Sequence, residues 1–315
     1  MTLTVAYISN AQGGGDSPKW RRLLPEALGE PVEVRAWPHV GAVEDIEVAL
    51  AWKAPRGALA KLPNLKLIVS LGMGVDHLLQ DDLLPPETPI VRIMDSGLIG
   101  QMSEYAIYFA LRHHRRMPDY EASQRAHKWQ IADFVDTADR RVGVLGMGAI
   151  GQDIARKITM LGFPTAGWSR TQRQLEGVEC LDGPAGLDRL LRRSDILINV
   201  LPLTPRTIGM VDAAFLAKLP GGAYFINIAR GGHVVDSDLL AALDSGHLSG
   251  AALDVFHEEP LPSTHAYWGH PKVLVTPHIA GETNPRTAAA SVAENIRRIR
   301  EGRPLVHTID RNEGY

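Results

Sequence analysis

The chain has 315 residues, of which 45% are hydrophobic and 22% are charged, so it can bury a large apolar interior and exceeds the usual length of one domain. Its formal net charge is -3, without a long run of one sign, which argues against nucleic acid or a membrane surface as a partner. A single cysteine, Cys180, excludes an internal disulfide and a thiolate cluster for zinc or iron-sulfur, and favours a reducing cytoplasm.

The first strand, expected within Met1–Asn10, carries no basic leader, and no apolar run approaches the roughly 20 residues that span a bilayer. We therefore expect neither a signal peptide nor a membrane segment. Short apolar runs then alternate with helical patterns, which is typical of α/β proteins with doubly wound parallel sheets. The strands expected in the first series are Leu3–Ser9, Val32–Trp37, Val48–Trp52, Leu67–Leu71 and Ile90–Met94.

A long helix is predicted over Met102–Arg116, ending before Pro118, and it bridges to a second series of strands. A further amphipathic helix is predicted over Pro285–Arg300, and the tail Pro304–Tyr315 is expected to pack back on the first sheet. Two doubly wound domains follow, residues 1–101 with 284–315 and residues 102–283. The second series comprises Val142–Leu145, Thr165–Trp168, Ile196–Leu201, Ala223–Ile228, Gly250–Val255 and Val273–Thr276, with helices such as Ile150–Leu161 and Ser237–Leu243 between strands.

A glycine fingerprint follows the first strand of this second series, in the sequence RVGVLGMGAIG. Gly146 permits a tight turn, Gly148 lets the backbone approach a pyrophosphate, and Gly151 allows close packing of helix on strand. The alternative is a glycine-rich turn without a ligand, which the strand and helix on either side disfavour. Gly13–Gly15 lacks that context and is expected to be a loop. The predicted cofactor contacts here also include Met147, Ala149 and Ile150.

The residues after the next strand indicate which dinucleotide is bound. An NAD site usually places a carboxylate there, whereas this chain has Ser169, Arg170 and Thr171. A guanidinium pairs with a 2'-phosphate and hydroxyls add donors, so NADPH is expected, with NADH as a weaker alternative. The competing interpretation is that Arg170 is a solvated surface residue.

Charged residues end three further apolar runs, at Arg230, Glu259 and His278. Ligands of doubly wound sheets bind beyond the carboxyl ends of the strands, so these side chains are expected to converge. Arginine can hold a carboxylate through two hydrogen bonds, histidine can give a proton to a carbonyl oxygen, and glutamate can orient the imidazole and favour its protonated form. Taken singly, each residue also has another interpretation. Arg230 could be a structural salt-bridge partner, Glu259 an exposed loop acid, and His278 a cap or a buried histidine whose hydrogen bonds are satisfied.

Two remaining features carry less information. The run Ser70–Asp76 leads a strand into a glycine-rich turn whose amides could bind an anion, although a simple turn is an equal alternative. No metal site is expected, because the remaining histidines show no convincing ligand spacing. These include His113, His114, His257, His265 and His270.

Together these segments resemble the D-isomer-specific 2-hydroxyacid dehydrogenases, and within them the glyoxylate/hydroxypyruvate reductase A branch. The resemblance covers essentially the whole chain and implies a flavodoxin-like substrate domain beside a Rossmann cofactor domain. Its motifs are the glycine fingerprint, Ala229–Gly231, Asp254–Pro260, Thr276–His278, Leu71–Leu79, Ser103–Ala106, His114–Arg116 with Tyr120 and Trp129, Phe163–Thr171, Leu201–Gly209 and Gly314–Tyr315.

The resemblance implies NADPH-dependent reduction of glyoxylate and hydroxypyruvate by a homodimer formed mainly through the cofactor domain. Arg230 and His278 would be the active-site pair, with Glu259 as the partner of His278. The amides of Met73 and Gly74 would hold the substrate carboxylate. The other residues that it implies are Leu71, Gly72 and Trp52 near the substrate, Asp254 at the nicotinamide carboxamide, and Leu201, Pro202, Ile228 and Ala229 at the cofactor.

Two positions depart from the family pattern, and two other functions stay open. Arg206 stands where relatives commonly have glutamate, and Glu282 stands where small or apolar residues are usual, which leaves substrate size and charge undecided. One alternative is an NAD-dependent relative acting on another hydroxy acid. The other is a dinucleotide-sensing binding protein like the corepressors that share this architecture.

Overall fold

The computed structural model describes residues 2–10 and 17–314 of the chain. It divides into two compact units, a smaller one of residues 1–98 and 282–315 and a larger one of residues 99–281. The domain crossings expected after residues 101 and 283 fall close to these divisions. The predicted loop at Gly13–Gly15 lies outside the described residues.

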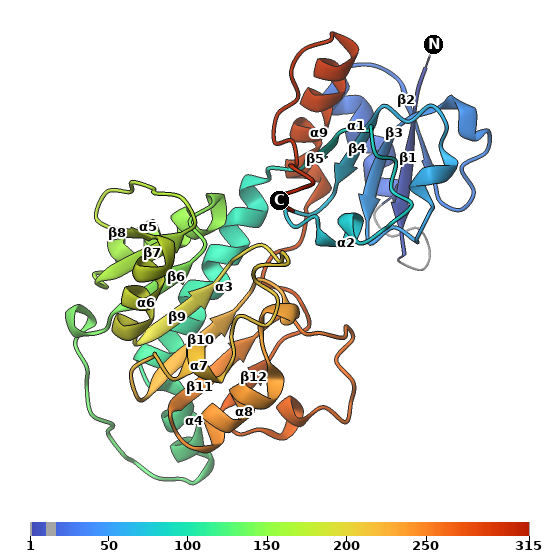
Figure 1. Cartoon of the computed structure of the whole chain (residues 1–315). Coiled ribbons are helices and arrows are strands. Elements are labelled where there is room, and N and C mark those ends of the chain that lie inside the picture. The colour runs from blue at the N-terminus through green and yellow to red at the C-terminus, as the bar shows by residue number, and fades with distance from the viewer. Residues whose placement is uncertain (1, 11–16, 315) are drawn as a thin grey trace. The chain divides into compact units, whose positions relative to one another are not determined.

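In its described residues, the smaller unit contains a five-stranded parallel sheet in the order β2-β1-β3-β4-β5, the flavodoxin-like order. Helices α1 and α9 cover one face and α2 lies against the other (Figure 1). Strands β1, β3 and β4 are buried on both faces, which explains why these segments are nearly continuous hydrophobic runs, whereas the edge strand β2 is only partly buried and carries charged residues. The elements are β1 (Leu3–Ser9), α1 (Ser17–Leu28), β2 (Val32–Ala36), β3 (Ile46–Trp52), β4 (Leu67–Ser70), α2 (Asp76–Leu79), β5 (Ile90–Arg92) and α9 (Pro285–Arg300).

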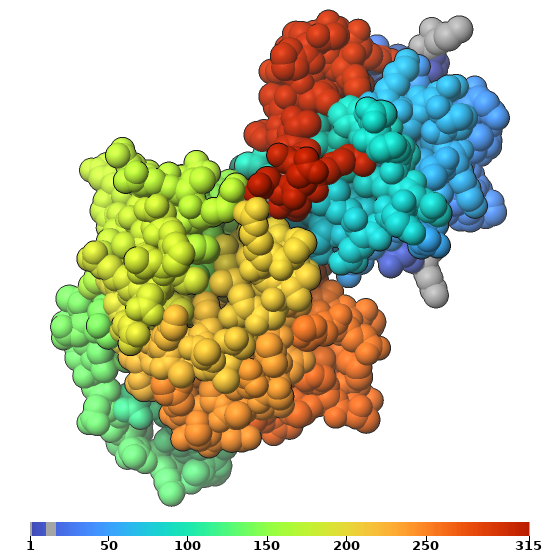
Figure 2. Space-filling view, in the orientation of Figure 1, coloured from blue at the N-terminus to red at the C-terminus, as the bar shows by residue number. Residues whose placement is uncertain are grey.

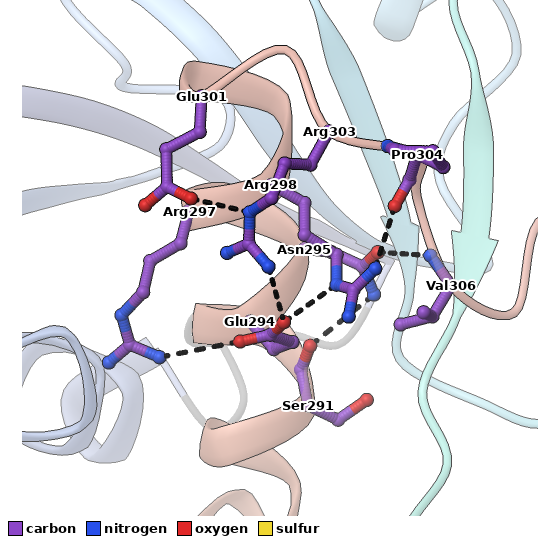
Figure 3. A network of polar contacts seen from close by, with 9 residues as sticks. All are labelled: Ser291, Glu294, Asn295, Arg297, Arg298, Glu301, Arg303, Pro304 and Val306. Carbon is purple, nitrogen blue, oxygen red and sulfur yellow. Dashed lines mark hydrogen bonds and ion pairs between the residues drawn. The ribbon is translucent and has the colours of Figure 1, made fainter.

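A polar network closes the C-terminal end of α9 (Figure 3). Glu294 Oε1 accepts a hydrogen bond from Arg298 Nε at 2.6 Å, and Arg298 Nη1 donates to the carbonyl of Pro304 at 2.9 Å. Asn295 is only 1% exposed, and its Oδ1 accepts from the Val306 backbone N–H at 2.9 Å. The network therefore fixes where the chain turns back after the helix.

The tail beyond this network lies along β5. Val91 and Thr308 form an antiparallel bridge, and the N–H of Ile309 donates to the carbonyl of Ile90 at 2.9 Å. The prediction that the tail packs back on the first sheet is confirmed, and the tail covers an edge strand whose polar groups would otherwise be open to pairing with another chain.

Residues 99–281 form a seven-stranded parallel sheet in the order β12-β11-β10-β9-β6-β7-β8. Helices α3 and α5 pack on one face, and α6, α7 and α8 on the other (Figure 1). The chain reverses direction across the sheet between β6 and β9, which is where doubly wound sheets bind ligands. The elements are α3 (Ser96–His114), which begins in the smaller unit, α4 (Met117–Arg125), β6 (Val142–Leu145), α5 (Ala149–Met160), β7 (Thr165–Ser169), β8 (Glu179–Asp182), α6 (Gly183–Arg193), β9 (Ile196–Asn199), α7 (Ala213–Leu216), β10 (Ala223–Asn227), α8 (Asp236–Asp244), β11 (Leu248–Leu253) and β12 (Val273–Val275).

The long helix differs from the prediction, which placed it over Met102–Arg116. It begins at Ser96 and ends at His114, and Arg116 then adopts φ 54° in the left-handed region, where an α-helix cannot continue. As predicted, the long helix ends before Pro118, which lies in the first turn of the next helix, α4, where a residue needs no N–H for the helix.

The predicted strands agree with the structure to within a residue or two at their ends, and one strand was missed. The predicted run Ile196–Leu201 stops at Asn199, because the Asn199 side chain accepts the N–H of Leu201 at 3.2 Å and so takes it out of the ladder. The missed strand is β8, whose sequence ECLD lacks an apolar run because it lies at the sheet edge and is only partly buried.

No helix among the residues that the structure describes has the length and apolar character needed to cross a membrane.

The α9 network makes a testable prediction about the tail. Replacing Asn295 with alanine leaves the Val306 N–H without its acceptor, so we expect a loss of about 1–3 kcal/mol of stability and faster amide exchange at Val306 and Ile309. Hydrogen exchange measured by mass spectrometry reports both sites. Glu301→Ala, which removes only an exposed ion pair with Arg303, is the control. Unchanged exchange at Ile309 in Asn295→Ala would contradict this account.

Candidate active site

The three predicted catalytic residues follow three neighbouring strands of the larger sheet. Arg230 lies in the loop after β10, Glu259 in the loop after β11 and His278 in the loop after β12. These strands are adjacent and parallel, so their loops leave the same edge of the sheet. The glycine fingerprint after β6 opens at that edge as well.

His278 and Glu259 are hydrogen-bonded to each other. His278 Nδ1 lies 2.8 Å from Glu259 Oε2, and the side chains are 27% and 21% exposed. The second carboxylate oxygen, Oε1, accepts the Phe256 backbone N–H at 3.1 Å, which orients the glutamate. A carboxylate on Nδ1 sets the tautomer of the ring and leaves Nε2 as the nitrogen that can deliver a proton from the protonated imidazole.

The loop that carries Arg230 is brought to the neighbouring loop by Gly231. A Cβ at Gly231 would lie 2.0 Å from the carbonyl carbon of Phe256 and 2.4 Å from the backbone nitrogen of His257, so only glycine permits this approach. The Arg230 side chain is partly buried and donates from Nη1 to the carbonyl of Ala229 at 2.7 Å. The backbone next to Arg230 is thereby held in close contact with the loop that presents Glu259.

A buried polar network, which the sequence analysis missed, braces the ends of β9 and β10. Asn199 Nδ2 donates to Asn227 Oδ1 at 3.1 Å and lies 3.2 Å from His233 Nδ1, and all three side chains are fully buried. Asn227 Nδ2 in turn donates to the carbonyl of Arg230 at 3.1 Å, and His233 Nε2 lies 3.2 Å from the carbonyl of Pro202. Asparagines inside apolar strands were the signal that could have revealed it, because buried amides need partners.

Asp254 lies at the end of β11 and is 1% exposed. Burial raises the pKa of its carboxyl above the usual range, and hydrogen bonds from Thr276, Ile279 and Ala280 act in the opposite direction. The carboxylate is therefore built into the loop of His278. Its expected contact with the nicotinamide carboxamide stays a prediction.

The glycine turn fits a dinucleotide. Gly146 has φ 101°, and a Cβ at Gly151 would lie 1.7 Å from the Gly146 carbonyl oxygen, so both positions require glycine. Gly148 is the N-cap of α5, makes no side-chain cap, and has open space where a Cβ would be. The first amides of α5 are thus available to an anion such as a pyrophosphate.

The other predicted cofactor residues lie at the same edge, and several can contribute only backbone. Met147 is 1% exposed and its sulfur fills the space beside Gly167, while Ile228 and Ala229 are buried at the end of β10. Arg170 is exposed directly after β7, the strand next to β6, and Ser169 Oγ donates to the Thr171 carbonyl at 2.7 Å. Ala149 and Ile150 begin α5, and Leu201 and Pro202 follow β9.

Within the smaller unit, the structure brings Trp52 and Gly72 together. A Cβ on Gly72 would lie 2.2 Å from Trp52 Cζ3, and the indole meets the His77 ring edge-on at 4.6 Å between centroids. Ser70 Oγ donates to the carbonyl of Gly72 at 3.0 Å and shapes the turn that continues through Met73. The assignment of Leu71, Gly72, Met73 and Gly74 to the substrate carboxylate stays a prediction.

Among the residues that the structure describes, no group of three or more His, Cys, Asp or Glu side chains could hold a metal ion.

Comparison with known proteins decides the family. The family model for the D-isomer specific 2-hydroxyacid dehydrogenase, NAD binding domain, matches residues 107–280. The chain is 39% identical over 305 residues to a glyoxylate/hydroxypyruvate reductase A of Escherichia fergusonii, covering 95% of this chain and 97% of that protein. The chain belongs to the D-isomer specific 2-hydroxyacid dehydrogenase family. The larger unit is accordingly its Rossmann-type domain.

Solved structures of this family superpose on the whole chain. A D-isomer specific 2-hydroxyacid dehydrogenase of Xanthobacter autotrophicus in complex with NADPH and MES is 42% identical, with a TM-score of 0.94 and full coverage of both chains. An NADPH-dependent glyoxylate/hydroxypyruvate reductase of Sinorhizobium meliloti in complex with NADP and sulfate is 39% identical, with a TM-score of 0.91 and full coverage of both chains.

Proposed function

We propose that the protein reduces small 2-keto acids with NADPH, converting glyoxylate to glycolate and hydroxypyruvate to glycerate. The observation that carries this proposal is the bond of 2.8 Å between His278 and Glu259, at the sheet edge that also holds Arg230 and the glycine turn. Reduction of a keto acid needs a proton donor and a group that binds the carboxylate. An imidazole paired with a carboxylate can supply the proton, and a guanidinium can bind the substrate. Relatives named as reductases of these two acids support the choice of substrate.

Each side chain has a separate task in the proposed reaction. NADPH, when bound, supplies the hydride that adds to the keto carbon. His278 gives its Nε2 proton to the keto oxygen as that hydride arrives, so the product is the hydroxy acid. Arg230 binds the substrate carboxylate and keeps the carbonyl oriented, and Glu259 stabilises the imidazolium before the proton leaves. The same proposal includes the backbone amides of Met73 and Gly74, which would donate further hydrogen bonds to the substrate carboxylate.

NADPH is proposed over NADH because Arg170 follows β7, where an NAD-specific site has a carboxylate. Its guanidinium and the hydroxyls of Ser169 and Thr171 suit a 2'-phosphate. The relatives in complex with NADPH or NADP support this choice. A cytoplasmic location, favoured by the lone cysteine, is part of the same proposal.

A homodimer is proposed through the loop between α4 and β6. Trp129, Ile131 and Phe134 are 99%, 83% and 76% exposed along this loop, a concentration of large apolar side chains that a monomer has no reason to keep in water. The loop stands clear of the sheet in Figure 1 and projects from the surface of the larger unit in Figure 2. A second copy of the chain would bury the same residues on both partners.

The proposed role of His278 is tested by replacing it with alanine. Loss of a general acid should lower kcat by about 10²- to 10⁴-fold while NADPH binding, measured by fluorescence titration, changes little. Oxidation of NADPH at its nicotinamide absorbance band, with glyoxylate added, measures turnover. His270→Ala is the matched control. His270 precedes β12, at the end opposite to His278, and it pairs with Asp244. Full turnover in His278→Ala would refute the proposal.

Cofactor preference is tested by Arg170→Ala. Losing a charge-assisted contact to the 2'-phosphate should lower kcat/KM for NADPH by about tenfold to a hundredfold and leave that for NADH nearly unchanged. Arg192→Ala, which removes an exposed arginine paired with Asp188 on α6, is the control. Equal losses with both cofactors would contradict a 2'-phosphate contact, and a wild-type preference for NADH would refute NADPH as the cofactor.

The dimer is tested by Trp129→Glu combined with Phe134→Glu. Two buried charges at an apolar interface should shift the protein from dimer to monomer in sedimentation equilibrium. Met160→Glu, at an exposed apolar residue near the end of α5, is the control for added surface charge. A monomeric wild type, or a double variant with unchanged mass, would overturn this interface.

A further inference from the structure

The backbone of the proposed general acid is held in an unfavourable conformation. His278 has φ 57°, in the left-handed region that residues with a Cβ rarely adopt because the Cβ crowds the following carbonyl oxygen. Such a conformation persists only where the surroundings determine it. The His278 N–H donates to the carbonyl of Thr276 at 3.0 Å, which tightens the chain on one side of the residue.

The other side is held by the Asp254 carboxylate. Its Oδ1 accepts the Ile279 N–H at 2.9 Å and its Oδ2 accepts the Ala280 N–H at 2.8 Å. The same Oδ1 accepts the Thr276 hydroxyl at 2.6 Å. One buried carboxylate therefore binds the chain both before and after His278, and the direction of the imidazole depends on where that carboxylate lies.

The chain of hydrogen bonds continues to helix α3. Tyr105 Oη lies 2.6 Å from Thr276 Oγ1. Thr276 has a single hydroxyl hydrogen and gives it to a carboxylate, so the tyrosine must be the donor in this pair. Burial raises the pKa of Tyr105, which keeps the phenol protonated as a donor requires. Tyr105 packs tilted against Phe109, at 4.5 Å between ring centroids, within the apolar core beneath the sheet.

We propose that Tyr105 and Thr276 are positioning residues for His278, acting through Asp254. The relay runs from the phenol of Tyr105 to the hydroxyl of Thr276, then to the carboxylate and on to the two amides that follow His278. Neither hydroxyl donates to the reacting groups themselves. Their function is to hold the imidazole at the angle at which it meets the keto oxygen, and this inference rests on the proposed role of His278.

The test compares Tyr105→Phe, Thr276→Val and Thr276→Ser. Removing the phenol hydroxyl costs one hydrogen bond, so Tyr105→Phe should lower kcat by roughly twofold to tenfold. Thr276→Val breaks the relay at its centre and should lower kcat by about tenfold to a hundredfold, whereas Thr276→Ser keeps the hydroxyl and should stay within about threefold of wild type. NADPH affinity and KM for glyoxylate should change little in all three.

Two further readouts separate positioning from a general weakening of the fold. Slower proton delivery should increase the solvent deuterium isotope effect on kcat in Tyr105→Phe and Thr276→Val. The double variant should be no slower than Thr276→Val, because both changes break the same relay. The matched control is Tyr267→Phe, since Tyr267 is buried and donates to Asp236 at 2.9 Å in the same kind of bond. Tyr267→Phe should have a thermal stability similar to that of Tyr105→Phe and Thr276→Val, and it should leave the isotope effect unchanged.

The inference is overturned if Tyr105→Phe and Thr276→Val keep the wild-type kcat while His278→Ala is inactive. It is also overturned if Thr276→Ser is as slow as Thr276→Val, or if kcat falls only in step with NADPH binding. Failure of the proposed function looks different. In that case His278→Ala keeps its activity, or the wild-type protein does not oxidise NADPH in the presence of glyoxylate.

Discussion

A buried carboxylate at the end of a central strand decides where the proposed acid of this enzyme lies. Asp254 accepts hydrogen bonds from Thr276, Ile279 and Ala280, and so holds His278 in a backbone conformation that it would leave if unsupported. Burying a carboxylate is costly, and three donors offset that cost. Asp254 is buried next to the loop whose conformation sets the direction of the His278 imidazole.

Close backbone contact is the second requirement of the site. A Cβ at Gly151 would clash with a carbonyl of the turn before α5, and a Cβ at Gly231 would clash with the loop after β11. One glycine brings helix amides to the place where a pyrophosphate would bind, and the other brings the arginine loop to the glutamate loop. The glycine motifs are therefore required for close contact between backbone segments as well as for contact with a ligand.

The polar groups buried behind the site follow the same logic. Asn199, Asn227 and His233 satisfy one another between strand ends, and each also bonds a carbonyl or amide of a neighbouring loop. A buried network of this kind favours one arrangement of the loops, because any arrangement that leaves one member unpaired is costly. It makes the ends of β9 and β10 rigid where apolar packing alone would allow several loop positions.

The sequence by itself determined the two parallel sheets and the glycine turn, and it singled out Arg230, Glu259 and His278 as the proposed catalytic residues, because apolar periodicity, glycine spacing and charges after strands are local signals. It missed the edge strand β8, whose burial depends on its neighbour. The pairing of Glu259 with His278 was expected from the sequence, and the structure adds its geometry. Only the tertiary structure joined Tyr105 to Thr276, residues far apart in the chain. Such pairings arise from strand order and helix packing, which local patterns constrain but do not encode.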